Sequence, residues 1–327
     1  MTNIALPADP RERMARARIA LEGLSVGDAL GETCFTPENF DAILEDPRVT
    51  ARAPWPWTDD TAMALGIFEV LDVHGCIDQD ALARRFASRF DAQPWRGYGS
   101  GAIRLLGAIR DGADWRTAST ALFGGGSFGN GSAMRIAPLA GYFAGDGYEK
   151  VAEQAALSAT VTHAHPEGIA GGIAAAVAGA YAWVNRDRRA EESVKRGMLE
   201  TVLAHVPVGD VRKGIERAAT FEFDLSIEPN VRLLDHGMKT VAFDVSIESI
   251  VRTLGNGSRI SCQDTVPFCL WVAARHLDDY QSAIVNAIRA GGDIDTNAAI
   301  VGGIVALATG VDAIPPDWRT DREELVI

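Results

Sequence analysis

The sequence predicts an all-α fold in which many helices pack into one domain, 1–327, with its core at about 14–312. Apolar residues recur at a spacing near 3.6 in many separate segments, which is the period of an amphipathic helix. Alanine, the residue with the highest helix propensity, is abundant. Alternating apolar and polar residues are scarce, and only 220–227 shows a weak strand-like pattern. Without a sheet to pack on, the helices must bury their apolar stripes against one another.

The expected helices follow one another along the chain, each with its own apolar stripe. Their ranges are 14–30, 61–73, 79–90, 103–109, 151–162, 168–183, 247–254, 265–276, 280–289 and 297–309. The stretch 206–239 has the weakest helical pattern, and we expect it to form a surface excursion over the core. Pro315 and Pro316 should close the final helix, and the acidic tail after them should be solvated.

Composition and charge exclude several classes of protein. The net charge of −13 and the pI near 4.9 argue against nucleic-acid binding, which requires a basic face. The most apolar segment, 169–184, is shorter than the ~20 residues of a membrane span, so we expect a buried core helix. Cys34, Cys76, Cys262 and Cys269 lack metal-binding spacing, and no signal peptide is visible. We expect a cytoplasmic monomer with reduced cysteines and no nucleic-acid or membrane partner.

A run of oxygen-bearing side chains, Thr-Asp-Asp-Thr at 58–61, opens one predicted helix directly after a rigid Pro-Trp-Pro-Trp loop. One such residue could be an N-cap, which accepts hydrogen bonds from the first turn. Three consecutive oxygen ligands exceed what a cap requires. The run is therefore also a candidate metal site.

A second set of oxygen ligands, Gly-Gly-Asp-Ile-Asp-Thr at 291–296, precedes the predicted helix 297–309. Capping again explains only one or two of them. Four aspartates and two threonines without His or Cys favour Mg²⁺ or Mn²⁺ over zinc. Four clustered carboxylates would repel one another, and two divalent cations would balance their charge. If the two turns meet in space, they predict a dinuclear metal site.

A glycine-rich run, Gly-Gly-Gly-Ser-Phe-Gly-Asn-Gly at 124–131, leads into Ser-Ala-Met-Arg. The backbone N–H groups of such a run can point at an anion where the chain enters a helix. A phosphate cradle is the functional interpretation, and a flexible loop is the alternative. The run is not a Walker A loop, since no Gly-Lys-Ser/Thr follows.

Three smaller motifs complete the set. His163, in the Thr-His pair at 162–163, could donate to a phosphate or stack on a base, although a lone His is more often structural. Asp28, in Gly-Asp-Ala-Leu-Gly-Glu at 27–32, suggests close helix packing near a polar site; a C-terminal glycine cap is the alternative. Gly-Asn-Gly-Ser at 255–258 is interpreted as a turn.

Together, these motifs resemble the ADP-ribosylglycohydrolase family, which includes dinitrogen reductase-activating glycohydrolase and the eukaryotic ADP-ribosylhydrolases. The resemblance covers about 16–310, with the motifs in the family's order. It depends most on Thr-Asp-Asp-Thr and Gly-Gly-Asp-x-Asp-Thr, with Gly-Asn-Gly-x-x-Met-Arg between them. The resemblance implies a compact orthogonal multi-helix bundle with a dinuclear metal site in a cleft.

The resemblance also implies roles for individual residues. Two Mg²⁺ ions, or Mn²⁺, would be held by Thr58, Asp59, Asp60, Asp293, Asp295 and Thr296. ADP-ribose would be wrapped by the loop residues Gly126, Ser127, Phe128, Gly129, Asn130 and Gly131. Further substrate contacts are expected from Asp28, Met134 and His163.

The sequence departs from the family at one position. Family members often carry a mobile acidic residue a few positions after Gly-Asp-x-x-Gly, where this chain has Phe35. The nearest acidic residues are Glu32 and Glu38, and we assign the gating role near the metals to Glu32.

The predicted reaction is magnesium-dependent hydrolysis of the glycosidic bond between ADP-ribose and a modified protein residue or small molecule, which releases ADP-ribose. Asp60 or Asp295 would accept the proton of the attacking water, and the transition state would resemble an oxocarbenium ion. Arginine is the expected acceptor; serine-linked ADP-ribose, O-acetyl-ADP-ribose and small ADP-ribosylated guanidines are the alternatives. Other classes that fit the motifs are a non-catalytic, crystallin-like relative, a module that only binds ADP-ribose, and a metal-dependent phosphohydrolase.

Overall fold

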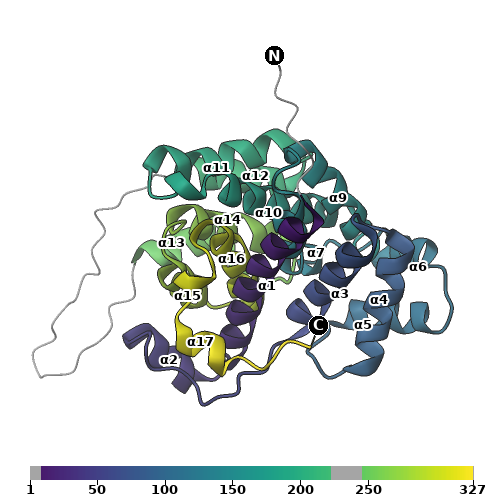
Figure 1. The fold of residues 1–327 in the computed structure, drawn as a ribbon, viewed down its shortest axis with the longest axis horizontal. Helices are drawn as coiled ribbons and strands as arrows, with labels where there is room; N and C mark the ends of the chain where they lie inside the picture. Colours follow the sequence, from purple (N-terminus) through teal and green to yellow (C-terminus); the bar gives the residue numbers. More distant parts are fainter. Residues whose placement is uncertain (1–8, 222–244, 327) are drawn as a thin grey trace, which may run out of the picture.

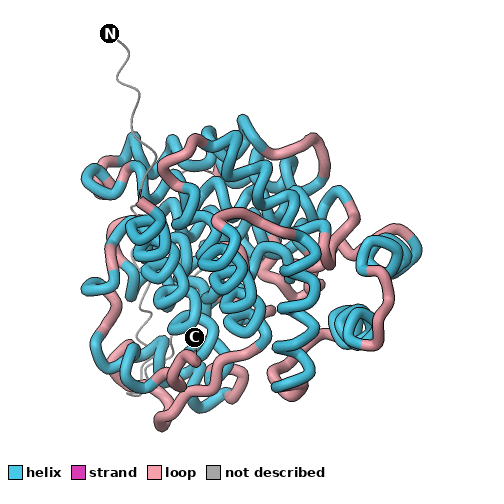
Figure 2. The backbone as a smooth tube through the Cα atoms, turned by 45° about the vertical axis from the view of Figure 1, so that its right-hand side comes forward, coloured by secondary structure: helices cyan, strands magenta, loops and turns pink. Residues whose placement is uncertain are grey.

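Helices form all the regular secondary structure in the computed structural model, which describes residues 9–221 and 245–326 (Figure 1). The α-helices are α1 (Pro10–Thr33), α2 (Pro37–Glu45), α3 (Asp59–His74), α4 (Gln79–Ala92), α5 (Ser100–Arg110), α6 (Trp115–Ala121), α7 (Gly131–Met134), α8 (Ala137–Phe143), α9 (Tyr148–Thr160), α10 (Pro166–Val184), α11 (Glu192–His205), α12 (Asp210–Thr220), α13 (Val245–Leu254), α14 (Cys262–Arg275), α15 (Tyr280–Arg289), α16 (Ile294–Thr309) and α17 (Pro316–Asp321). Figure 2 shows no strand within these residues, and the all-α prediction is confirmed.

Each helix expected from periodicity is present, but other helices between them were missed, among them the 14-residue α11. One correction concerns 206–239, where residues 210–220 form α12 rather than a surface excursion. Val211, Ile215 and Ala218 bury one face of this helix, at helical spacing, and charged residues occupy the positions between them. Residues 222–239 of this stretch, and most of the weak strand pattern at 220–227, lie outside the described residues.

Helices α1 and α16 touch through their backbones. A Cβ atom added at Gly23 would lie 2.4 Å from the Gly302 carbonyl oxygen, and one at Gly27 would lie 2.2 Å from that of Ala298. At Gly31 a Cβ would lie 2.7 Å from the Asp295 Cα. The glycine cap considered for 27–32 is therefore wrong, because α1 continues to Thr33 and its glycines serve close packing. This packing brings the end of α1 against the start of α16.

Helix α10 is the one described helix long and apolar enough to cross a membrane by length and composition alone. It has 19 residues, and 78% of its most apolar window is buried inside the structure. It packs against α8, α9, α14 and α16. Core helices of globular proteins meet the same criterion, and this burial matches the core helix expected at 169–184.

The C-terminal segment corrects two expectations. Pro316 opens α17 instead of closing the last long helix, which ends at Thr309; proline suits a first turn because its missing N–H needs no partner there. The tail after α17 is also not freely solvated. The Trp55 N–H donates to the Asp321 carbonyl at 2.7 Å, and the Glu323 N–H donates to the Trp55 carbonyl at 2.9 Å. The tail therefore lies along the loop that leads to α3.

Candidate active site

The two oxygen-rich turns meet at the start of α3 and the start of α16. Thr58 is the N-cap of α3, and its hydroxyl accepts a hydrogen bond from the Asp60 N–H at 3.3 Å. One carboxylate oxygen each from Asp28, Asp60 and Asp295 lies within 4.8 Å of the other two. Both helix N-termini carry partial positive charge, which favours carboxylates at this point.

Asp28 is buried beside the turn at Thr58–Thr61. Its carboxylate accepts hydrogen bonds from the backbone N–H and the hydroxyl of both Thr58 and Thr61, at 3.0 and 2.8 Å for Thr58. The side chain is fully buried and does not line the cleft. This placement corrects the expectation that Asp28 binds substrate: it fixes the turn that presents Asp59 and Asp60.

Asp60 provides the test of whether these residues fit a metal. One of its carboxylate oxygens, Oδ1, is buried and has no hydrogen-bond partner among the described residues. Burial, and then the charges of neighbouring aspartates, raise the pKa of Asp60 and of Asp295 well above the usual range. The same causes raise the pKa of Asp59 to about 7. A buried carboxylate oxygen without a donor is costly, and an oxygen-ligated divalent cation between these carboxylates would remove that cost.

The remaining predicted ligands line the same cleft, a cavity of about 500 Å³. Asp59 is half-buried at the first position of α3. Asp293 Oδ2 accepts a hydrogen bond from the Asn130 amide at 2.6 Å, and Asp295 accepts one from the Thr296 N–H at 2.8 Å. The structure thus gathers all six predicted ligands, together with Asp28, at one end of the cleft.

The glycine-rich loop forms the wall beside these carboxylates. Its lining residues are Ser127, Phe128, Gly129, Asn130 and Gly131, followed by Met134. Gly126 does not line the cleft. It turns the chain at φ +90°, and a Cβ atom added there would lie 2.5 Å from the backbone nitrogen of His165. Because the Asn130 amide also donates to the Thr265 hydroxyl at 3.0 Å, it ties the loop to both α14 and the Asp293 turn.

His163 lies under the loop and lines the cleft. A Cβ at Gly131 would lie 2.9 Å from its ring, and the Thr162 hydroxyl is 2.7 Å from its Nδ1. Burial, and then the positive charge of Arg135, lower the pKa of His163 to about 3. The imidazole is therefore neutral near pH 7 and offers a substrate a hydrogen bond rather than a charge.

Part of the cleft lining is apolar, and of its large side chains only Phe128 and Met134 were predicted from the sequence. Phe123, Phe128 and Ile260 line the cleft while remaining 61%, 46% and 64% exposed. Phe123 and Ile260 adopt left-handed backbone angles, φ 55° and 52°, which non-glycine residues rarely adopt and which cluster at functional sites. Exposed aromatic and aliphatic side chains around a cavity suit the flat face of a base.

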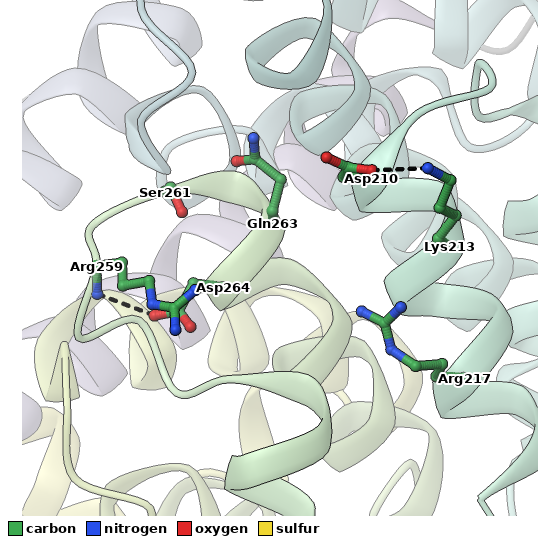
Figure 3. Close-up of a pocket in the computed structure, with 7 residues that line it drawn as sticks. All are labelled: Asp210, Lys213, Arg217, Arg259, Ser261, Gln263 and Asp264. Carbon is green, nitrogen blue, oxygen red and sulfur yellow. Dashed lines mark hydrogen bonds and ion pairs between the residues drawn. The ribbon is translucent and has the colours of Figure 1, made fainter.

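The loop 255–261, of which 255–258 was interpreted only as a turn, forms part of the site. Gly257 packs so closely on Asp293 that a Cβ would lie 2.6 Å from the aspartate Cβ. Ile260 lines the cleft, whereas its neighbours Arg259 and Ser261 line a second, separate depression of about 300 Å³ between α12 and the start of α14 (Figure 3). The glycines at 255 and 257 were the sequence signal for this loop, and only the packing shows what it contacts.

Glu32 is half-buried near the end of α1 and does not line the cleft. Burial, and then the charge of Asp28, raise its pKa, and its own charge contributes to the raised pKa of Asp295. Phe35 is 51% exposed just after α1, and Glu38 lies in the first turn of α2. Glu32 is thus within electrostatic range of the carboxylate cluster, and its gating role stays a prediction.

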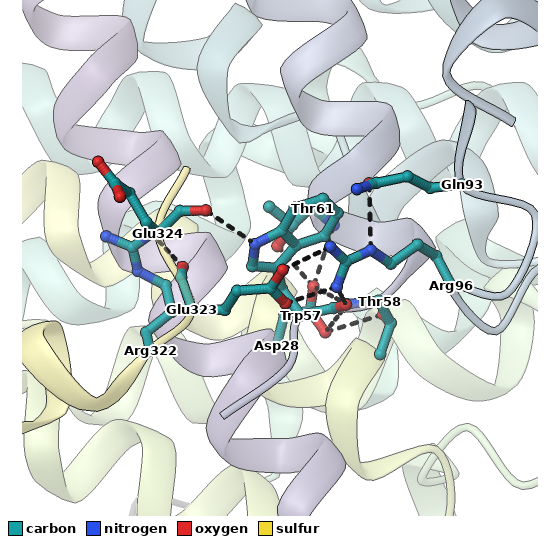
Figure 4. Close-up of polar contacts among 9 residues, drawn as sticks. All are labelled: Asp28, Trp57, Thr58, Thr61, Gln93, Arg96, Arg322, Glu323 and Glu324. Carbon is teal, nitrogen blue, oxygen red and sulfur yellow. Dashed lines mark hydrogen bonds and ion pairs between the residues drawn. The ribbon is translucent and has the colours of Figure 1, made fainter. Parts of the chain in front are cut away.

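The C-terminal tail braces the approach to the carboxylates (Figure 4). The Arg96 guanidinium donates to both carboxylate oxygens of Glu323, at 2.6 and 2.7 Å, and to the Trp57 carbonyl at 2.9 Å. It also stacks 3.3 Å above the Trp57 ring. Trp57 directly precedes Thr58, so the contact of Arg96 with Trp57 fixes the backbone just before the turn Thr58–Asp60.

A Glu323→Gln substitution should weaken this brace. The amide keeps the shape but loses the charge that pairs with Arg96, so we expect divalent-metal affinity to fall by about three- to tenfold. The measurement is a calorimetric titration with Mg²⁺. Glu324→Gln is the matched control, because the Glu324 side chain is exposed and only its carbonyl meets Trp57. Equal metal affinities for the two variants would contradict a bracing role.

Stability of the metal-free protein should depend on pH through Asp59. Its pKa in the folded state, about 7, lies above its ordinary value of 3.8. Its stabilising contribution is therefore present below about pH 4 and is lost as pH rises toward 7. A divalent cation must displace this proton, so metal affinity should rise by up to about tenfold per pH unit for each proton released. Thermal melting at pH 5.5 and pH 8, with EDTA and with Mg²⁺, should give the larger metal-induced shift at pH 8. A shift that is the same at both pH values would contradict this expectation.

Comparisons with known proteins agree with this geometry. The sequence model of the ADP-ribosylglycohydrolase family matches residues 9–326. Human ADP-ribosylhydrolase ARH3 is 28% identical over 343 residues, which cover 95% of this chain and 90% of the human protein. An uncharacterized protein of Archaeoglobus fulgidus is 30% identical, with coverage of 94% and 92%. A solved ADP-ribosylglycohydrolase-related protein complex has a chain with a TM-score of 0.64 at 23% identity, covering 96% of this chain and 94% of that one, which shows the shared fold.

Proposed function

The chain belongs to the ADP-ribosylglycohydrolase family, and from this we propose that it hydrolyses the glycosidic bond between ADP-ribose and a modified residue, in a reaction that depends on two Mg²⁺ ions. One observation carries the metal dependence: the unpartnered Asp60 Oδ1, buried among the carboxylates that α1, α3 and α16 bring together. The same cleft is also lined by the glycine-rich loop and by the apolar side chains of Phe123, Phe128 and Ile260, and the rest of ADP-ribose would bind along them.

Each part of the cleft has a distinct task in this proposal. Bound Mg²⁺ would lower the pKa of a water molecule and hold the ribose hydroxyls. Asp60 or Asp295 would accept a proton from the attacking water. Loop N–H groups would orient the diphosphate, and Phe128 would contact the base. Binding energy gathered far from the reacting bond would thus hold the ribose carbon in place.

The acceptor linkage is the finer part of the proposal. Arginine was expected from the resemblance to dinitrogen reductase-activating glycohydrolase. The curated relatives from human and cow are instead named ADP-ribosylhydrolase ARH3, and they cover 95% of this chain. We infer that this chain shares their linkage preference. A panel of arginine-linked ADP-ribose, serine-linked ADP-ribose and O-acetyl-ADP-ribose, measured beside human ARH3, should give the same rank order. If this chain cleaved only the arginine linkage, and human ARH3 did not cleave it, the original expectation of an arginine acceptor would hold instead.

The decisive experiment measures the mass of the product with Mg²⁺ and with EDTA. Intact ADP-ribose, released only with the metal, is the expected result. Products with a cleaved diphosphate would instead identify a phosphohydrolase. Tight ADP-ribose binding without turnover of any linkage would identify a binding module. Release that persists in EDTA would remove the metal from the proposal.

We further propose that the protein acts as a cytoplasmic monomer. Its four cysteines are free thiols, three of them buried, which suits a reducing compartment. Light scattering of the purified protein would test the monomer, and fractionation of the source cells would test the compartment.

A further inference from the structure

A second depression lies where α12, the loop 257–261 and the start of α14 meet (Figure 3). It has a volume of about 300 Å³ and shares no lining residue with the catalytic cleft. Its lining is polar and charged throughout: Asp210, Lys213, Arg217, Arg259, Ser261, Gln263 and Asp264. The proposed reaction uses none of these residues.

Two polar groups face this depression without a partner. Ser261 occupies the N-cap position of the 14-residue α14, but its side chain accepts no capping hydrogen bond. The residue is only 6% exposed, and its hydroxyl forms no hydrogen bond with the described residues. The Gln263 side-chain oxygen is also buried and unpartnered. Rotation of this amide would present its nitrogen as a donor instead. A helix N-terminus with an idle hydroxyl beside it is suited to bind an anion.

The charges in the depression leave two guanidinium groups unpaired. Asp210 pairs with Lys213 at 2.9 Å, and Asp264 accepts the backbone N–H of Arg259 at 2.9 Å, so both carboxylates are engaged. The guanidinium groups of Arg217 and Arg259 form no hydrogen bond or ion pair within the described part of the chain. In a protein with a net charge of −13, Arg217 from the last turn of α12 and Arg259 just before α14 line one depression and mark a local site for negative charge.

We propose that this depression binds a phosphate-class oxyanion, either inorganic phosphate or a phosphomonoester. Arg217 and Arg259 would pair with its charge, and the Ser261 hydroxyl and the first turn of α14 would donate hydrogen bonds. The site adjoins the catalytic cleft through one short segment: the Cys262 N–H donates to the Phe128 carbonyl at 3.0 Å, and Ile260 lines the cleft.

Calorimetric titration with inorganic phosphate tests the site. The full chain is first saturated with ADP-ribose, so that the catalytic cleft is filled. Saturable phosphate binding is expected, and the double variant Arg217→Gln/Arg259→Gln should weaken it at least about tenfold. Arg84→Gln, which removes an equally exposed charge from α4, is the matched control and should bind like the unmodified protein. The substitution Ser261→Ala should weaken phosphate binding about threefold. It provides a second test of the site if the double variant does not fold.

Glycerol 3-phosphate, titrated in parallel, distinguishes the two sources of the ligand. Tighter binding of this ester than of phosphate would indicate an organic phosphate, and the reverse would indicate the free ion; either result supports the site. If phosphate bound only when ADP-ribose is absent, and bound the double variant with equal affinity, its binding site would be the catalytic cleft. That result would overturn the proposal. Absence of binding at millimolar phosphate would overturn it as well. None of these outcomes depends on turnover, so failure here is separable from failure of the proposed function.

Discussion

Asp60→Asn should strongly reduce turnover and yet raise the melting temperature of the metal-free protein. Asp60 lies within 4.8 Å of two other carboxylates, and its Oδ1 atom has no partner within the described chain. The amide would remove one like charge and supply donors to its neighbours, which should stabilise the metal-free fold by about 1 kcal/mol. Without a ligand oxygen of full charge, turnover should fall about a thousandfold, since metal assistance contributes several kcal/mol.

The measurement pairs steady-state rates with thermal melting in EDTA and in Mg²⁺. Asp72→Asn is the matched control, because Asp72 is exposed on the same helix, α3. A lower rate together with a higher melting temperature would identify Asp60 as a metal ligand. Loss of a purely structural residue would lower both the rate and the stability. An Asp60→Asn protein that still gains stability from Mg²⁺ and still turns over would contradict the metal assignment.

Gly27→Ala should be among the most destabilising single-methyl changes in the chain. Its Cβ would lie 2.2 Å from the Ala298 carbonyl oxygen and 2.7 Å from the carbonyl carbon. These are backbone atoms of α16 and cannot swing away, so α1 and α16 would have to separate. Overpacking of a core typically costs 1–3 kcal/mol, and we expect about 3 kcal/mol or more here. Because Asp28 and Asp295 lie on the two helices, metal affinity should fall as well.

Urea unfolding of Gly27→Ala and Gly107→Ala isolates the packing contribution. Gly107 is also a helical glycine, in α5, but nothing lies within 4 Å of a Cβ built there. Alanine at that position should therefore stabilise by about 0.5–1 kcal/mol through helix propensity alone. If both variants were stabilised, the close contact between α1 and α16 would be refuted.

Local sequence patterns were sufficient to predict the parts of the site that are encoded by neighbouring residues. Thr58 to Asp60 and Asp293 to Thr296 each form a short run at the start of an apolar helix, and the two helices begin two and three residues before the positions expected from periodicity. The glycine-rich loop was recognisable for the same reason. That the two turns meet was a conditional expectation, and only the packing of α1 on α16 satisfies it.

Long-range packing determines what the sequence could not reveal. The small residues around Asp28 predicted close helix packing, which the contact with α16 confirms, but they did not reveal that the Asp28 side chain is fully buried. The ion pair of Arg96 with Glu323 joins residues that are 227 positions apart in the sequence, so no local pattern indicates it. The left-handed angles of Phe123 and Ile260 are imposed by their surroundings, since neither residue type favours them.

The distance along the chain between α3 and α16 has a consequence for the biosynthesis of the protein. A ribosome completes Thr58–Asp60 long before it reaches Asp293–Thr296, so the nascent chain holds only half of the carboxylate set for most of its synthesis. Like charges on the two halves then oppose the last step, in which α16 docks beside α1. Cellular magnesium would act on that step as a counter-ion as well as a cofactor. Acquisition of the metal would thus be a late event that reports a completed fold.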